Sequence, residues 1–172
     1  VIVAAERERD RAESDPHVRT PCASAGLSVI CPSMHGDAIE ARLRATSIFR
    51  EAAADDLMAI ARETTIRRID EGQSLWRAGD AATHFAIVTR GIVHVVRRHP
   101  NREASTVGIF GAREWVGTVA VLQRKPFPAE AVASTEVVEL MWIRAEPVLA
   151  LMARSPSLVL RFNADLCERA EM

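Results

Sequence analysis

The sequence predicts a mainly β fold, an antiparallel barrel or sandwich with helices before and after it. From Thr64 onward, short runs rich in Val, Ile, Thr and aromatic residues recur at close spacing and are separated by turn residues. On both sides of this region, apolar residues recur every three to four positions, which indicates amphipathic helices. With 172 residues, of which 48% are apolar, the chain can bury the core of one domain and still carry an extension.

Residues 1–36 are predicted to form a flexible N-terminal arm. They begin with a highly charged stretch and continue into PHVRTPCASAGLSVICPSMHGD, which has no sustained period. Helical signals start at Asp37, first in DAIEARLRA and then in DDLMAIARE. Asp55 and Asp56 fall in the first turn of the second helix, where the helix dipole favours negative charge. The folded domain is therefore expected to span residues 37–154.

Seven segments are predicted strands: TTIRRI, SLWRA, HFAIVT, IVHVVRR, ASTVGIF, EAVAS and EVVELMWI. Many short strands with turn signals between them are typical of an antiparallel sandwich or barrel. HFAIVT and IVHVV are joined through Arg90 and Gly91, and a glycine can take the positive φ that a tight hairpin requires. We therefore expect these two strands to pair as a hairpin.

The chain returns to helix after the last predicted strand. AEPVLALMARS has a proline near its first turn. Ser155 as N-cap and Pro156 as first residue then begin a final helix over residues 155–172. Its apolar positions share one face: Leu158, Val159, Phe162 and Leu166. This face either covers the helix's own barrel or pairs with a second copy, and we expect a homodimer through these residues.

Charge and cysteine content narrow the function classes. The formal net charge of −1 gives no electrostatic basis for binding nucleic acid or an acidic membrane directly. No apolar run approaches the roughly 20 residues that span a bilayer. The three cysteines, Cys22, Cys31 and Cys167, are too few for a disulfide scaffold and favour a reducing cytoplasm.

The glycines of the β region carry a family resemblance. Gly72, Gly79 with Asp80, Phe85, Ile87, Gly91 and Val93 recur at the spacing of the cyclic-nucleotide-binding-domain superfamily. Within it, the chain resembles the sensor domains of Crp/Fnr-type bacterial transcription regulators, from Ile48 to Met172. The resemblance implies a double-stranded β-helix (jelly-roll) barrel, N-terminal helices, and a dimerisation helix that starts within residues 155–172. It also implies that DNA is contacted only through a helix-turn-helix domain, which this chain does not contain.

The family's phosphate cassette corresponds to VGTVAVLQRKPFPAEAVA, residues 116–133, here called the cassette. The family pattern is Gly-Glu-hydrophobic-Ala/Gly, followed further along by Arg-Ser/Thr-Ala. Gly117, Val119 and Ala120 fit this pattern. Thr118 replaces the ribose-binding glutamate, and Pro128 and Ala129 replace the phosphate-binding arginine and its serine or threonine. These six residues are the candidate effector pocket.

The cassette has lost the groups that a cyclic nucleotide needs. A buried phosphate requires donors that replace its water shell, and hydrogen bonds to charged groups contribute about 1.5–3 kcal/mol each. Arg124 and Lys125 are close in sequence, but on the intervening turn they are expected to point to solvent. We therefore predict an effector-sensing regulatory domain that does not bind cyclic AMP in the usual mode.

Several alternatives stay open at the level of sequence. The chain could be a stand-alone nucleotide-binding or protein-interaction module. A cupin-like metalloprotein is disfavoured because there is no His-x-His on a strand, although His84 and His94 could be neighbours across a hairpin. Haem and an iron–sulfur cluster remain alternatives for the cofactor, but a cluster wants four thiolates. No nucleophile elbow or phosphate-cradling loop occurs, so no enzymatic activity is expected.

Overall fold

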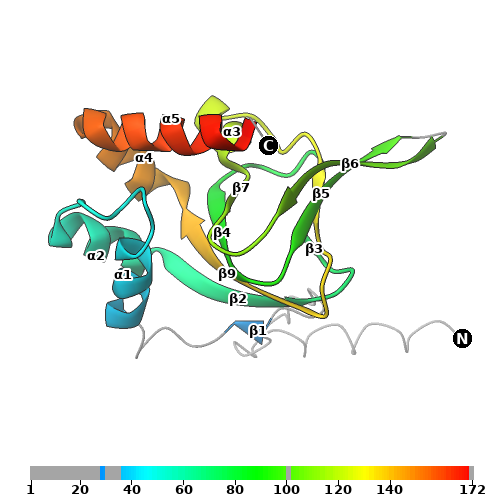
Figure 1. The fold of residues 1–172 in the computed structure, drawn as a ribbon, viewed down its shortest axis with the longest axis horizontal. Helices are drawn as coiled ribbons and strands as arrows, with labels where there is room; N and C mark the ends of the chain where they lie inside the picture. The colour runs from blue at the N-terminus through cyan, green and yellow to red at the C-terminus, as the bar shows by residue number, and fades with distance from the viewer. Residues whose placement is uncertain (1–27, 30–35, 100–101, 171–172) are drawn as a thin grey trace, which may run out of the picture.

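The structure is a computed structural model that describes residues 28–29, 36–99 and 102–170 (Figure 1). Two helices precede the β region and two follow it: α1 (Gly36–Arg44), α2 (Ala54–Arg62), α4 (Ala145–Arg154) and α5 (Pro156–Ala170). These are the four predicted helices, and α5 begins at Pro156 as expected. No helix in the described part of the chain is long and apolar enough to cross a membrane.

The β region consists of two antiparallel sheets. The first runs in the order β1 (Ser28–Val29), β2 (Thr64–Asp70), β9 (Val137–Arg144), β4 (His84–Arg90), β7 (Trp115–Val116). The second runs in the order β3 (Ser74–Trp76), β8 (Glu130–Ala133), β5 (Val93–His99), β6 (Arg102–Phe110). All seven predicted segments are strands. The sequence did not reveal β1 and β7, since two-residue strands carry no periodic signal.

The predicted hairpin between HFAIVT and IVHVV is wrong. These segments are β4 and β5, which lie in different sheets, so Gly91 starts a crossing from one sheet to the other. Gly91 does take a positive φ of 83°. The crossing is held by the β8–β9 connection: Ile92 N donates to Thr135 Oγ1 (3.1 Å) and Ser134 N donates to the Ile92 carbonyl oxygen (2.9 Å). A glycine with positive φ is needed at either kind of turn, so it does not tell them apart.

The two faces of the five-stranded sheet contribute to different cores. On β4 and β9, Phe85 and Ile143 pack against the helices, whereas Ala86 and Trp142 pack against the four-stranded sheet. Neighbouring strand residues point to opposite faces, and here both faces are covered. This is why β4 reads as a continuous apolar run rather than an alternating one.

Helix α5 covers the barrel of its own chain. Leu158 and Phe162 are 5% and 1% exposed and belong to the core between the helices and the five-stranded sheet, and Leu166 packs against it. For Leu158, Phe162 and Leu166 the structure supports the other interpretation of this face, because they pack against the barrel of their own chain. A homodimer that involves this helix stays a prediction. Val159 is half-buried, and the large apolar side chain that α5 leaves exposed is Leu160, at 70%.

Most of the predicted N-terminal arm lies outside the described residues, as do Cys22 and Cys31. Within residues 1–36, Ser28 and Val29 form β1, which pairs antiparallel with Arg68 and Arg67 of β2. This pairing adds an edge strand to the five-stranded sheet.

Candidate functional site

The cassette forms a tight turn followed by a short helix. Strand β7 ends at Val116, Gly117 adopts φ 84°, and α3 (Thr118–Gln123) follows directly. A Cβ at position 117 would lie 2.9 Å from Phe127 Cε1 and 3.2 Å from Trp76 Cη2. Gly117 is thus required both by its backbone conformation and by the two aromatic rings packed against it.

The cassette lines a cavity of about 240 Å³. The wall combines β3, β5, β6, β7, α3, the segment before β8 and α5, and it consists of Trp76, Val95, Phe110, Trp115, Gly117, Thr118, Val119, Ala120, Phe127, Pro128, Ala129 and Leu166. All six candidate pocket residues are among them. Leu166 places α5 at this cavity, and in Figure 1 the end of α5 lies beside α3 and β7.

Stacked aromatic rings form one side of the cavity. Trp76 lies against Phe127 with ring centroids 4.1 Å apart and 12° between their planes. Trp76 Nε1 donates a hydrogen bond to the Ala129 carbonyl oxygen (3.1 Å). This pair could not be predicted from the sequence, because the two rings are far apart along the chain and a lone tryptophan is most often a core residue.

The cavity wall carries one unpaired polar side chain and no charged one among the described residues. Thr118 is 4% exposed, and its Oγ1 has no hydrogen-bond partner. Leaving a buried hydroxyl unpaired costs about 1–3 kcal/mol. The position that replaces the family's glutamate therefore holds a buried hydroxyl that no described residue satisfies.

Replacing Thr118 with valine is expected to raise the free energy of unfolding by about 1 kcal/mol, since valine has the same shape and leaves no unpaired hydroxyl. Urea unfolding followed by circular dichroism measures this. Thr64→Val is the matched control: Thr64 is equally buried, but its hydroxyl donates to the Ile60 carbonyl oxygen (2.7 Å), so the change should destabilise. A loss of stability in Thr118→Val similar to that in Thr64→Val would contradict the unpaired state of Thr118.

A cluster of Ser74, Arg98 and Glu130 lies on the outer face of the four-stranded sheet. Arg98 Nε and Ser74 Oγ donate to Glu130 (2.6 and 2.5 Å), and these bonds, Ser74 first, hold the pKa of Glu130 below its ordinary value. Val96 pairs with Glu130, while the preceding Val95 lines the cavity. Alternation along β5 thus keeps this cluster outside the barrel. Arg124 and Lys125 are exposed, as expected, and do not line the cavity.

Comparison with protein-family models assigns this fold to a family. The model of the cyclic nucleotide-binding domain matches residues 66–155. The chain belongs to the cyclic nucleotide-binding domain family. The predicted jelly-roll barrel with flanking helices is thereby confirmed. No protein with a curated description matches the sequence.

Solved structures of sensor and regulatory proteins show the same fold. The sensor domain of the transcriptional regulator DNR from Pseudomonas aeruginosa is 18% identical, with a TM-score of 0.70, over 80% of this chain and 91% of that one. The catabolite activator protein of Thermus thermophilus is 25% identical, with a TM-score of 0.58, over 72% and 58%. The regulatory domain of Toxoplasma gondii PKA, solved with cAMP, is 17% identical, with a TM-score of 0.63, over 76% and 50%. The chain spans only 50–62% of three of the matched structures.

The histidines in the described part of this cyclic nucleotide-binding domain do not gather at a metal site. His84 stacks on Trp142, with ring centroids 5.0 Å apart, and its Nδ1 lies 2.9 Å from Thr83 Oγ1. Arg67 Cζ lies 4.3 Å from the centroid of the same tryptophan ring. Burial, followed by the charge of Arg67, lowers the pKa of His84. In the described ranges, no three His, Cys, Asp or Glu side chains are grouped so as to hold a metal ion.

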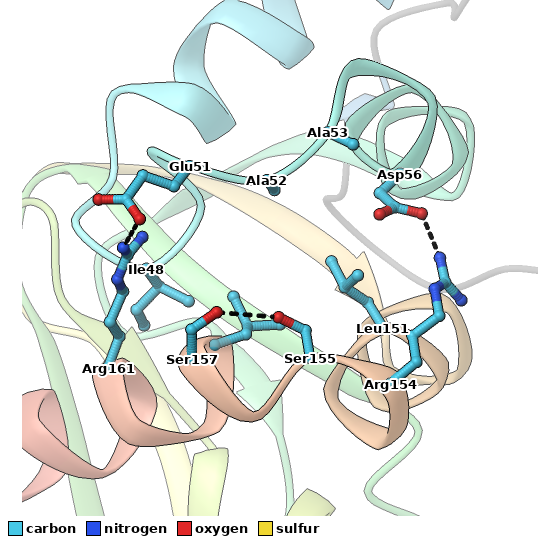
Figure 2. A pocket seen from close by; sticks show the side chains of 11 residues that line it. Ile48, Glu51, Ala52, Ala53, Asp56, Leu151, Arg154, Ser155, Ser157 and Arg161 are labelled. Carbon is cyan, nitrogen blue, oxygen red and sulfur yellow. Dashed lines mark hydrogen bonds and ion pairs between the residues drawn. The ribbon is translucent and has the colours of Figure 1, made fainter.

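A further cavity, of about 190 Å³, lies at the junction of the helices (Figure 2). Arg161 and Arg154 reach across it to Glu51 and Asp56, and the hydroxyls of Ser155 and Ser157 lie 3.2 Å apart between the two ion pairs. Each ion pair includes a largely exposed partner and contributes at most about 1 kcal/mol. The two ion pairs join α5 to the connection between α1 and α2, and α4 to α2.

Proposed function

We propose that this domain senses an effector in the cassette cavity, as the regulatory part of a Crp/Fnr-type transcription regulator, and that the effector is not a cyclic nucleotide bound in the usual way. The observation that carries the proposal is the chemistry of the cavity wall. The residues at the family's glutamate and arginine positions are Thr118 and Pro128, and no charged side chain among the described residues lines the cavity.

A phosphate in this cavity would lose its water shell without gaining charged donors. Such burial is costly unless the charge is paired. Two missing hydrogen bonds at about 2 kcal/mol each amount to roughly a thousandfold in affinity. The stack of Trp76 and Phe127 favours an apolar occupant at the same place.

Contacts with α5 support a sensing role. Trp115 lines the cavity and its ring centroid lies 5.0 Å from that of Phe162 on α5. Leu166, one turn further on, lines the cavity itself. An occupant would therefore touch α5 directly and through Trp115, and any difference in its affinity for two positions of α5 would shift the balance between them.

The remaining parts of the proposal rest on the family. We propose that a further domain supplies DNA binding, that the regulator acts in the cytoplasm, and that it works as a dimer. A second copy would pair with the exposed side of α5, at Leu160, since Leu158 and Phe162 are used internally.

Hydrogen exchange of the α5 amides, measured by mass spectrometry, tests the proposal. Val119 lines the cavity, and its side chain is 57% exposed. A tryptophan at this position gains free energy by burying its apolar ring in the cavity, out of water. We expect Val119→Trp to change exchange along α5, and millimolar cyclic AMP to change nothing. Val107→Trp is the control, because Val107 is similarly exposed on β6 and does not line the cavity.

Two outcomes would count against the proposal. Protection of α5 by cyclic AMP would overturn the exclusion of the usual ligand. Identical α5 exchange in Val119→Trp, Val107→Trp and the wild type would overturn the sensing role.

A further inference from the structure

We propose that the cassette cavity binds the apolar body of an amphipathic anion, and that the anionic end of this ligand lies outside the cavity, beside Arg97. The proposal rests on the sensing function above and specifies the chemical class of the effector.

The cassette cavity is open to solvent where Val119 and Pro128 lie. Both residues line the cavity and both are exposed, whereas Trp76 and Phe127 in the same wall are almost fully buried. A ligand can therefore place one end among apolar side chains and keep its other end in water. Concave, mostly apolar pockets of this kind are typical of small-molecule sites.

The surface that the cavity offers to the buried end of a ligand is hydrocarbon. The wall side chains that are at least partly exposed are Val95, Phe110, Val119, Pro128 and Leu166. The hydroxyl of Thr118 is buried away from solvent, and Trp76 Nε1 already donates to the Ala129 carbonyl oxygen. A space of about 150 Å³ holds the six carbons of benzene, so about 240 Å³ has room for a chain of roughly eight carbons.

A second pocket, rich in arginine, adjoins the cavity. It has a volume of about 430 Å³, and Pro128 lines both spaces. Arg77, Arg97 and Arg98 line the second pocket, together with one acidic residue, Glu130. Arg98 is paired with Glu130, so the other two arginines give this pocket an excess of positive charge.

Alternation along β5 places Arg97 on the same side of the strand as the cavity. Val95 lines the cavity, and residues two apart on a strand point to the same side. Arg98 instead follows Val96, which pairs with Glu130 on the outer face. Arg97 is exposed and forms no ion pair with a described residue.

An anion beside Arg97 would gain a charge-assisted hydrogen bond. Because it would stay partly in water, it would avoid most of the desolvation cost of a charge buried inside the cavity. The positive pocket thus favours an anionic end group, and the apolar cavity favours the hydrocarbon attached to it.

The hydrocarbon body distinguishes this ligand from a cyclic nucleotide. A nucleoside carries ribose hydroxyls and base nitrogens, and burying such groups without hydrogen bonds costs free energy. Among the described residues of the cavity wall, no accessible polar side chain is available to pair them.

Three probes test the two ends of the ligand. Octanoate has the apolar chain and the anion, octylammonium has the same chain with the opposite charge, and acetate has the anion alone. Ligand-observed NMR titrations of the wild-type chain give their dissociation constants. We expect octanoate to bind best, octylammonium at least about threefold more weakly, and acetate at least about tenfold more weakly, since it lacks the apolar chain.

Variants separate the two contacts. Arg97→Gln should weaken octanoate about threefold to fivefold without weakening octylammonium, whereas Val119→Trp, which fills the cavity, should weaken both. Arg124→Gln is the control, because Arg124 is also exposed but lines neither pocket. No octanoate binding, octylammonium binding as tightly as octanoate, or equal octanoate affinity in Arg97→Gln and Arg124→Gln would each overturn the proposal.

The two proposals fail in different ways. If octanoate does not bind but Val119→Trp still alters α5 exchange, the ligand class is wrong and sensing stands. If octanoate binds as expected but neither it nor Val119→Trp alters α5 exchange, the cavity binds a ligand without regulatory output and the sensing function is wrong.

Discussion

Replacing Phe162 with alanine is expected to lower the free energy of unfolding by about 3–5 kcal/mol, the usual cost of deleting a buried phenyl ring. Phe162 is 1% exposed and packs edge-on against Trp115, with Phe85 at 5.9 Å. The loss would leave a cavity between α5 and the barrel. Urea unfolding monitored by circular dichroism measures it.

The same experiment distinguishes a helix that covers its own barrel from a dimer interface. Leu160→Ala, on the exposed side of α5, should change stability by less than about 0.5 kcal/mol at protein concentrations too low for the proposed dimer to form. The loss in Phe162→Ala should be the same at low and high protein concentration, because no partner is involved, whereas dimer contacts make stability depend on concentration. If the loss in Phe162→Ala depended on protein concentration, Phe162 would take part in a contact between two copies of the chain.

Gly91→Ala is expected to cost about 3 kcal/mol or more. The residue has φ 83°, and an added Cβ would lie 2.5 Å from the Val137 carbonyl oxygen and 2.6 Å from Thr135 Oγ1. A left-handed conformation costs a non-glycine residue roughly 1–2 kcal/mol, and the clash with backbone adds to this. Thermal unfolding compared with the wild type gives the difference.

Gly79→Ala separates the two causes of this loss. Gly79 has φ 93°, but a Cβ there would meet nothing within 4 Å. Its replacement should therefore show the backbone cost alone, roughly 1–2 kcal/mol. If both variants lose the same stability, the close packing of the sheet crossing at Gly91 is not present in solution.

Local features of the fold could be predicted from the sequence, and the pairing of distant segments could not. The strands were predictable because β-branched and aromatic runs between turn residues are local signals. The partners of β4 were not: β4 pairs with β9 and β7, while β5 pairs with β6 and β8. Gly91 correctly indicated a turn after β4, but it did not indicate that the next strand lies in the other sheet.

The candidate site likewise has a part that local sequence patterns predict and a part that they do not. Gly117, Thr118 and Pro128 could be assigned from a short pattern, and all three line one cavity. The stack of Trp76 on Phe127 joins segments far apart in the chain, so no local pattern reveals it. On α5, the apolar stripe indicated that one face is buried. The contact between Phe162 and Trp115, which the sequence pattern does not reveal, shows that this face packs against its own chain.

The place of β9 in the sheet also constrains how the chain can fold during its synthesis. Along the five-stranded sheet, β9 lies between β2 and β4, and Thr64 pairs with Ile143. β2 and β4 must therefore wait for a strand that is synthesised well after both of them. Until then β2 and β4 each have an unpaired edge, and unpaired strand edges promote aggregation. Such distant pairings make folding slow. The five-stranded sheet is complete only after β9 has been synthesised and has paired with β2 and β4.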